Sequence, residues 1–218
     1  MPSSWKGKTP PQKPDFADWK DHGEESLKAA RAVAVKFRDD VVRLEAIHDR
    51  AGYALTLCGI SGTGKTFLGN CILNELGRDA WGNLNNVQGY IRGNQLVRGN
   101  YMRRDWRKLS DGFKSGQFEI LDDLESAFLV MLDDIGADYD PSGMGTSKLD
   151  RVLRSRTGKW TILTCNLTLN QIADGLDTRI ASFLIRDGNR VCEIKAQDYA
   201  TRPATPPCAG RRLGGFKI

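Results

Sequence analysis

The sequence predicts an α/β domain in which buried parallel strands alternate with helices, and three observations support this fold. A glycine-rich stretch, GISGTGKT, separates an apolar run at residues 53–58 from a helix-like run at residues 67–76. Two continuous apolar runs, FLVML at 128–132 and WTILT at 160–164, are too short for helices, so they should be strands buried on both faces. The 218 residues leave room for one such domain with a sizeable core, but not for two.

The two ends of the chain differ from its middle in composition. Seven of the eight prolines lie at residues 2–14 or 203–207. We therefore expect a flexible arm at 1–22, one folded domain at 23–200 and a flexible basic tail at 201–218. Trp5, Phe16 and Trp19 stand out in the arm, because aromatic residues in a polar segment are often anchors on the protein's own core or on a partner.

Composition also bears on the compartment. The five cysteines form no C-x-x-C pair, and Cys58, Cys165 and Cys192 fall in apolar runs, which suits small core residues better than a disulfide or zinc framework. No run of 18 or more apolar residues occurs, and residues 1–20 lack the apolar run of a signal peptide. We expect a cytoplasmic protein without a membrane span.

The first elements after the arm follow from spacing. Apolar residues recur at helical intervals from Glu24 onward, which predicts one long helix or two helices broken at Asp39 and Asp40. These apolar residues are Leu27, Ala30, Ala34, Phe37, Val41 and Leu44. Residues 53–58 then predict a strand, and residues 67–76 predict a helix that ends at Gly77.

The stretch GISGTGKT matches G-x-x-x-x-G-K-[ST], the pattern of a phosphate-binding P-loop. Such a loop wraps a phosphate with successive backbone N–H groups, and its glycines leave the approach open. Lys65 is expected to contact the β- and γ-phosphates, Thr66 to bind Mg²⁺ through its hydroxyl, and the following helix to add its N-terminal dipole. The residues expected around the nucleotide are Gly59, Ile60, Ser61, Gly62, Thr63, Gly64, Lys65, Thr66 and Phe67.

Charge is unevenly distributed in the middle of the chain. Residues 85–118 hold seven basic and two acidic residues, whereas residues 119–140 hold eight acidic residues and no basic one. This division indicates one anion-facing and one cation-facing segment. A second strand is predicted within residues 86–91, followed by a helical region through Leu96, Tyr101, Met102, Trp106 and Leu109.

Aromatic residues alternate with the basic ones in this region. Its basic residues include Arg98, Arg103, Arg104, Arg107 and Lys108. With Tyr101, Trp106 and Phe113 among them, the pattern fits single-stranded nucleic acid, where arginines meet phosphates and aromatic rings stack on bases. It fits equally well a solvated helix face whose aromatic residues belong to the core.

Polar residues follow both apolar runs named above. Asp133 and Asp134 come directly after the run at 128–132, and an aspartate at the carboxyl end of a buried parallel strand can hold Mg²⁺ opposite a P-loop. Asn166 follows the second run and could orient an attacking water or contact the γ-phosphate. Further elements are predicted as a helix at 145–156, a helix at 177–184 with Arg179 near its start, and a last strand at 191–195.

In this order, GISGTGKT, FLVMLDDIGAD, TILTCN and DTRIASFLIRDGNRV resemble the DnaC/IstB-like family of AAA+ ATPases, the bacterial and phage helicase loaders and transposition helpers. The resemblance covers about residues 24–200. It implies a three-layer P-loop fold of the ASCE class with five parallel strands in the order 5-1-4-3-2. By position, residues 59–66 match Walker A, Asp133 and Asp134 match Walker B, and Asn166 matches sensor 1. Lys65, Asp134 and Asn166 would then be catalytic, and Thr66 and Asp133 would hold Mg²⁺.

The sequence departs from the wider AAA+ pattern in three places. Asp134 stands where most AAA+ enzymes have glutamate, and its shorter side chain suggests slow, switch-like ATP hydrolysis. The family usually has two arginines four residues apart near Arg179, but here the second position is Phe183. Arg179 is therefore the arginine-finger candidate, with Arg186 as the alternate. Only 19 residues follow Tyr199, too few for a separate helical lid, so we expect an open pocket that a neighbouring subunit completes.

Several functions are compatible with these features. The first is a helicase loader that binds ATP, Mg²⁺ and single-stranded DNA, forms homo-oligomers with both, and delivers a replicative helicase. The second is an IstB-like transposition helper that marks target DNA. A small-molecule kinase is a lesser alternative, because no arginine-rich lid or acceptor motif is visible, and a guanine-nucleotide switch lacks the N-K-x-D motif. A last alternative is an adaptor whose arm at 1–22 grips a partner.

Overall fold

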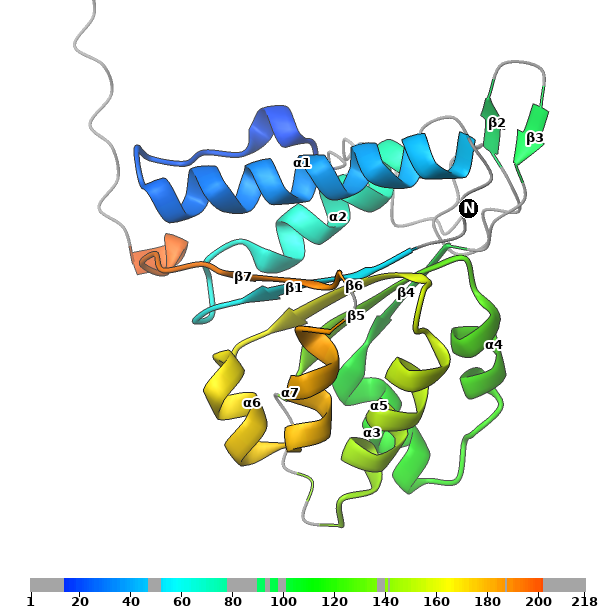
Figure 1. The fold of residues 1–218 in the computed structure, drawn as a ribbon. Coiled ribbons are helices and arrows are strands. Elements are labelled where there is room, and N and C mark those ends of the chain that lie inside the picture. Colours follow the sequence, from blue (N-terminus) through cyan, green and yellow to red (C-terminus); the bar gives the residue numbers. More distant parts are fainter. Residues whose placement is uncertain are drawn as a thin grey trace, which may run out of the picture.

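A computed structural model describes residues 14–46, 52–77, 90–92, 95–97, 101–136, 140, 142–186 and 188–201. Figure 1 shows three layers, with the sheet in the middle, helices α1 (Glu25–Ala46) and α2 (Lys65–Gly77) on one face, and the later helices on the other. The strands of the central sheet are β1 (Ala54–Cys58), β4 (Tyr101–Asp105), β5 (Leu129–Ile135), β6 (Trp160–Cys165) and β7 (Arg190–Glu193). No helix in the described residues is long and apolar enough to cross a membrane.

The central sheet is parallel throughout, in the order β4-β5-β6-β1-β7. If these five strands are numbered 1 to 5 along the chain, starting with β1, the order read from β7 to β4 is 5-1-4-3-2. This is the order that the family resemblance implies. Strand β6 lies between β1 and β5, so Cys58 pairs with Cys165 and Ile135 also pairs with Cys165. The carboxyl ends of three strands therefore meet at one edge of the sheet, directly beside the P-loop.

Alternation along the buried strands divides the core into two halves. On β5, Leu129 and Met131 pack toward α1 and α2, whereas Val130 and Leu132 pack toward the helices of the opposite face. All four side chains are fully buried. The continuous apolar run that predicted this strand thus fills both halves of the core, as expected for a parallel strand covered on each side.

The helices of the second face are α3 (Trp106–Lys114), α4 (Ile120–Ser126), α5 (Met144–Ser155), α6 (Leu169–Gly175) and α7 (Thr178–Leu184). Helices α4 and α6, of seven residues each, are not predicted from the sequence, whereas α7, of the same length, is predicted. Helix α6 begins with a capping box between Thr168 and Gln171, a local signal that marks its start.

Helix α1 is continuous through Asp39 and Asp40, which decides between the two alternatives for this segment. Asp40 is buried because it faces the core, where it accepts hydrogen bonds from the Tyr53 hydroxyl at 2.9 Å and from Lys36 Nζ at 3.0 Å. These partners satisfy a carboxylate that would otherwise interrupt the apolar face of the helix.

The region between the P-loop helix and β5 corrects the sequence prediction. The helical region expected from Leu96 to Leu109 contains a strand at Tyr101–Asp105, and only Trp106 onward is helical. Pairing with β5 places Tyr101 and Met102 on opposite faces of the sheet, a burial pattern that a helix could not produce. Strand β4, not the predicted segment at 86–91, is therefore the second strand of the central sheet.

Strands β2 (Tyr90–Arg92) and β3 (Gln95–Val97) form a separate antiparallel pair. Most of the predicted strand at 86–91 lies outside the described residues, as do Trp5 and the tail after residue 201. The described part of the arm contains a 3₁₀ helix at Phe16–Asp18, and the chain after β7 contains another at Tyr199–Thr201. Phe16 is 4% exposed and belongs to the same core cluster as residues of α1 and α2. It therefore anchors the arm on the protein's own core.

Candidate nucleotide-binding site

The P-loop connects β1 to α2 at the edge where the central strands end. Gly59, Gly62 and Gly64 all have positive φ angles, of 142°, 74° and 89°, a region that side chains on L-residues disfavour. The ring of Trp19 lies against the loop, so that a Cβ atom on Gly64 would come within 2.6 Å of it. Glycine is therefore required here both by the backbone and by the close approach of the arm.

Lys65, the first residue of α2, is folded back over its own loop. Its Nζ donates hydrogen bonds to the carbonyl oxygens of Gly59 at 2.8 Å and Ile60 at 2.6 Å, and the residue is only 4% exposed. Burial lowers the pKa of the Lys65 amine, while the nearby Asp134 carboxylate acts in the opposite direction. The cation is thus held at the mouth of the loop by backbone carbonyls, where a phosphate could compete for it.

Thr66 and Asp133, the two residues predicted to hold a metal ion, contact each other. The Thr66 hydroxyl donates to Asp133 Oδ1 at 2.8 Å, and the Thr164 hydroxyl of β6 donates to the same oxygen at 2.7 Å. Hydroxyl and carboxylate oxygens are the ligands that Mg²⁺ prefers, and bound phosphates usually supply the rest. The residues present therefore fit Mg²⁺, and Thr66 and Asp133 would be the protein ligands that hold it. The sequence does not identify Thr164 as a site residue, although a polar residue at the end of a buried strand is a signal that could have indicated it.

Asp134 points differently from Asp133 because the backbone changes conformation between them. Asp134 has a φ of 60°, and the β5–β6 register shifts between Leu132 and Ile135. Its N–H donates to the Thr164 hydroxyl at 2.9 Å, and its Oδ1 accepts from Asn166 Nδ2 at 3.2 Å. The predicted pair of Asp134 and Asn166 is thus brought together, at some cost in backbone strain that a functional position can retain.

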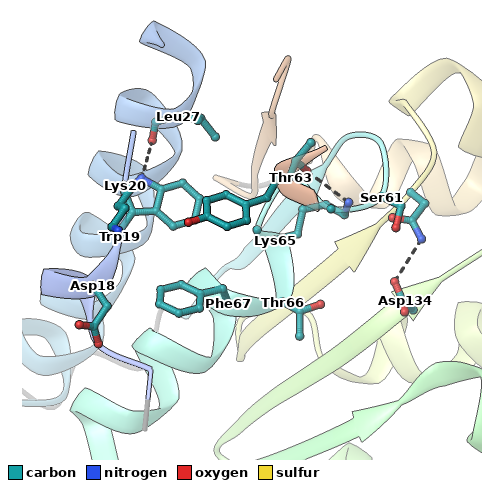
Figure 2. A pocket seen from close by; sticks show the side chains of 14 residues that line it. Asp18, Trp19, Lys20, Leu27, Ser61, Thr63, Lys65, Thr66, Phe67 and Asp134 are labelled. Atoms are coloured by element: carbon teal, nitrogen blue, oxygen red, sulfur yellow. Dashed lines mark hydrogen bonds between the residues drawn. The ribbon is translucent and has the colours of Figure 1, made fainter. Parts of the chain in front are cut away.

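A cavity of about 510 Å³ runs along the P-loop. Figure 2 shows Trp19 and Phe67 at one end, Lys65 and Thr66 in the middle, and Asp134 at the other end. Trp19 donates from Nε1 to the carbonyl oxygen of Leu27 at 3.3 Å, and its ring lies 6.0 Å from that of Phe67. The other residues that line the cavity are Asp18, Lys20, Leu27, Ser61, Gly62, Thr63, Gly64, Asn166 and Tyr199.

The two ends of the described chain therefore both contribute to the walls of this cavity. Trp19 comes from the arm, and Tyr199 follows the last strand, with its N–H donating to the carbonyl oxygen of Gly62 at 2.9 Å. The sequence indicates that Trp19 is an anchor but does not place it in the site. Nothing in a single sequence indicates that residues 45 positions apart, Trp19 and Gly64, are in contact.

The Asp133 carboxylate also pairs with a residue that was predicted to bind DNA. Arg103 of β4 donates from Nη2 to Asp133 Oδ2 at 2.7 Å. The Asp133 side chain is 8% exposed, whereas that of Arg103 is 44% exposed. The pairing follows from the register of the edge strand β4, whose Asp105 lies beside Asp133, and it connects the basic region to the nucleotide site.

The aromatic residues of the basic region belong to the core. Tyr101, Trp106 and Phe113 are 3%, 2% and 1% exposed, so they are not available to stack on bases, and the core alternative is correct. Arg104 is partly exposed, and Arg107 and Lys108 are exposed. Arg103, Arg104 and Lys108 line a groove of about 630 Å³ with Asn70, Leu73, Asp105 and Leu109. Arg98 lies outside the described residues.

Neither arginine-finger candidate lines the cavity of its own chain. Arg179 is held by Asp177, with Nη2 at 2.7 Å from Oδ2, and its side chain remains 65% exposed. Arg186 donates to the Ser182 hydroxyl at 3.0 Å. Both therefore lie on the surface of α7 or just after it, outside the lining of the cavity.

No family model and no curated protein sequence matches the chain. Solved structures do match it. A crystal structure of DnaI has a TM-score of 0.60 and 23% identity, covering 85% of this chain and 90% of that one. The DnaC helicase loader has a TM-score of 0.60 and 19% identity, covering 84% of this chain and 97% of that one. The replication initiator DnaA, bound to AMPPCP and single-stranded DNA, has a TM-score of 0.59 and 17% identity, covering 85% and 50%.

These similarities confirm the expected fold, which this chain shares with DnaI, the DnaC helicase loader and the replication initiator DnaA. They agree with the DnaC/IstB-like resemblance of the sequence motifs.

Proposed function

We propose that this protein is a P-loop ATPase that acts in DNA replication. The observation that carries the proposal is the arrangement of Lys65, Thr66, Asp134 and Asn166 along one cavity, with Asp133 hydrogen-bonded to Thr66 and Asn166 to Asp134. A small-molecule site with a few convergent polar groups is the usual form of an active site. The fold shared with AMPPCP-bound DnaA supports ATP as the nucleotide.

The residues then have distinct roles in hydrolysis. Lys65 leaves the carbonyls of Gly59 and Ile60 to contact the β- and γ-phosphates, and the loop amides hold the same phosphates. Asp134, oriented by Asn166, accepts a proton from the attacking water. Bound Mg²⁺ would neutralise charge that develops on the phosphates, with Thr66 and Asp133 as its ligands. The short side chain of Asp134 favours slow turnover.

The aromatic end of the cavity is suited to the base. Trp19 and Phe67 offer ring faces, and Leu27 an apolar side chain, at the end opposite Asp134 (Figure 2). Base–aromatic stacking contributes about 1 to 3 kcal/mol. Replacing Trp19 by alanine should therefore weaken ATP binding about tenfold, while replacement by phenylalanine should largely preserve it.

The central test compares Lys65→Ala with Asp134→Asn in nucleotide titrations and single-turnover hydrolysis. Lys65→Ala should weaken binding of a non-hydrolysable ATP analogue at least about tenfold, whereas Asp134→Asn should bind it normally and fail to hydrolyse ATP. The exposed Lys28→Ala on α1 is the matched control for charge removal. Equal analogue binding by Lys65→Ala would contradict the proposal.

Fast hydrolysis by the wild type without DNA or partner would contradict slow, switch-like turnover.

The partners we propose are single-stranded DNA and a replicative helicase, in a cytoplasmic protein that oligomerises with ATP and DNA. The fold shared with the DnaC helicase loader supports the helicase, and the partly exposed Arg104 and the exposed Arg107 and Lys108 support DNA. Affinity for DNA should fall steeply with salt, because each phosphate contact releases counterions. Charge reversal at Arg104 and Lys108 should weaken binding of an oligo(dT) probe, and unchanged binding would remove this surface from the proposal.

Oligomerisation and the helicase need separate measurements. Light scattering with ATP analogue, Mg²⁺ and oligo(dT) should show assemblies larger than a monomer. In such an assembly, we expect Arg179 or Arg186 of one subunit to face the cavity of the next. A pull-down from the native host with ATP analogue should retain a replicative helicase. Recovery of a transposase instead would favour the transposition-helper alternative.

A further inference from the structure

Arg103 occupies one side of the carboxylate that the nucleotide site needs for its metal ion. Asp133 Oδ1 already accepts from the hydroxyls of Thr66 and Thr164, while Oδ2 accepts from Arg103 at 2.7 Å. Asp133 is nearly buried, so its negative charge is balanced by this guanidinium from the edge strand. The Arg103 side chain therefore supplies a positive charge next to the Asp133 carboxylate.

The same arginine also belongs to the groove that Arg104 and Lys108 line. Arg103 lines it together with Arg104 and Lys108, next to Asn70 and Leu73 of α2. Its side chain is 44% exposed, so the guanidinium can leave Asp133 without breaking the core packing. One side chain thus borders both the proposed metal site and the proposed DNA-phosphate site.

We infer that Arg103 couples nucleotide binding to nucleic-acid binding by exchanging Asp133 for a DNA phosphate. A divalent cation at Asp133 and the guanidinium repel each other, and both need the same carboxylate. Arg103 therefore leaves Asp133 when Mg²⁺–nucleotide binds and adds its charge to the groove. By linkage, a phosphate in the groove that draws Arg103 away raises the affinity of the carboxylate for the cation by the same factor.

This inference rests on the proposed function but can fail separately from it. Its first half concerns the metal alone, and the measurement is the Mg²⁺ concentration needed for half-maximal binding of a non-hydrolysable ATP analogue to the full chain. Arg103→Gln should lower this concentration at least about fivefold, because the competing cation is gone. Arg104→Gln, one residue along the same strand, should leave it unchanged. No shift in Arg103→Gln would overturn the inference whether or not DNA binds.

The second half concerns coupling. The measurement is the affinity for oligo(dT) in the presence of ATP analogue and Mg²⁺, divided by the affinity in the presence of ATP analogue and EDTA. The wild type should show a ratio of about five or more, and Arg103→Gln a ratio near one. Arg104→Gln should weaken oligo(dT) binding under both conditions but keep the wild-type ratio. A preserved ratio in Arg103→Gln would overturn the inference. Normal analogue binding without any oligo(dT) binding would instead refute the DNA part of the proposed function, and the coupling with it.

Discussion

At the scale of single residues, Arg156 makes a set of buried polar contacts. It is 1% exposed, and its guanidinium donates to the Thr161 hydroxyl and to the carbonyl oxygens of Leu124, Ala127, Phe128 and Trp160. Burial lowers the pKa of Arg156 to about 10, so it is still charged at neutral pH. It ties the end of α4 to the starts of β5 and β6, and it is a structural residue that no motif predicts.

Replacing Arg156 should therefore destabilise the fold strongly. Arg156→Met leaves several buried carbonyl oxygens without donors, and we expect the free energy of unfolding in urea to fall by about 3 kcal/mol. Arg156→Lys should recover only part of this loss, because lysine has three donors and no planar fork. The exposed Arg151→Met is the control and should cost less than about 1 kcal/mol. Equal losses at the two positions would show that the buried contacts contribute little.

At the scale of elements, helix α1 stays continuous at a place where the sequence alone also allows a break, because a residue outside the helix bonds to one of its aspartates. Asp39 and Asp40 look like a break in the helix, yet Asp40 turns inward to Tyr53 on the approach to β1. Burial alone would raise the pKa of Asp40, but hydrogen bonds from Lys36 and Tyr53 and the charges of Lys36 and Arg43 outweigh it and lower the pKa.

This shift makes a prediction about pH. A carboxylate whose pKa is lower in the folded state contributes stability above its unfolded pKa of about 3.9, and this contribution is lost as pH falls through the folded value. Asp40→Asn should therefore lower the free energy of unfolding by about 1 to 2 kcal/mol at pH 7 and by clearly less at pH 3. Asp39→Asn, on the exposed face, is the control. A difference between wild type and Asp40→Asn that stays constant with pH would contradict this assignment.

Helix α6 depends on its cap, because seven residues form few internal hydrogen bonds. The Thr168 hydroxyl accepts from the Gln171 N–H, and the Gln171 side chain accepts from the Thr168 N–H. Thr168→Ala should lower the free energy of unfolding by about 1 kcal/mol. Thr157→Ala, at an exposed position after α5, should have a smaller effect. Urea unfolding of both variants checks this, and equal effects would show that the cap is not important.

At the scale of the whole molecule, the arm and the segment after β7 complete a cavity that the central sheet leaves open at one end. The arm at 1–22, expected as a flexible unit and possible docking element, contains Phe16 in the core and Trp19 in the cavity wall. Deleting all of it to test partner binding would therefore also damage the fold.

Two truncations should separate these roles. Deletion of residues 1–13 should leave the free energy of unfolding and ATP-analogue affinity unchanged, since Phe16 and Trp19 remain. Deletion of residues 1–22 should cost about 3 kcal/mol for the lost Phe16 packing and weaken analogue binding about tenfold. If partner binding is lost in the shorter deletion, the adaptor role belongs to residues 1–13. Normal analogue affinity in the longer deletion would exclude Trp19 from the nucleotide site.

The sequence was most informative where chemistry depends on local spacing. The P-loop requires glycines and a lysine at fixed intervals, and residues 128–132 and 160–164 had to be strands because no helix of that length could bury them all round. Prediction failed at Tyr101–Asp105, where a short edge strand carries exposed arginines and shows neither a strand nor a helix period clearly. Pairing with β5 decided that segment.

By itself, the sequence determined the P-loop, the carboxylates opposite it, and the α/β class, since each rests on residues close together in the chain. Only the tertiary structure decided which distant residues meet. The pairing of Arg103 with Asp133 depends on β4 lying beside β5, and the contact of Trp19 with Gly64 depends on the arm lying along α2, from Asn74 to Phe67. Such contacts are set by strand order, register and packing, which sum many weak interactions over the whole molecule and leave no local signal.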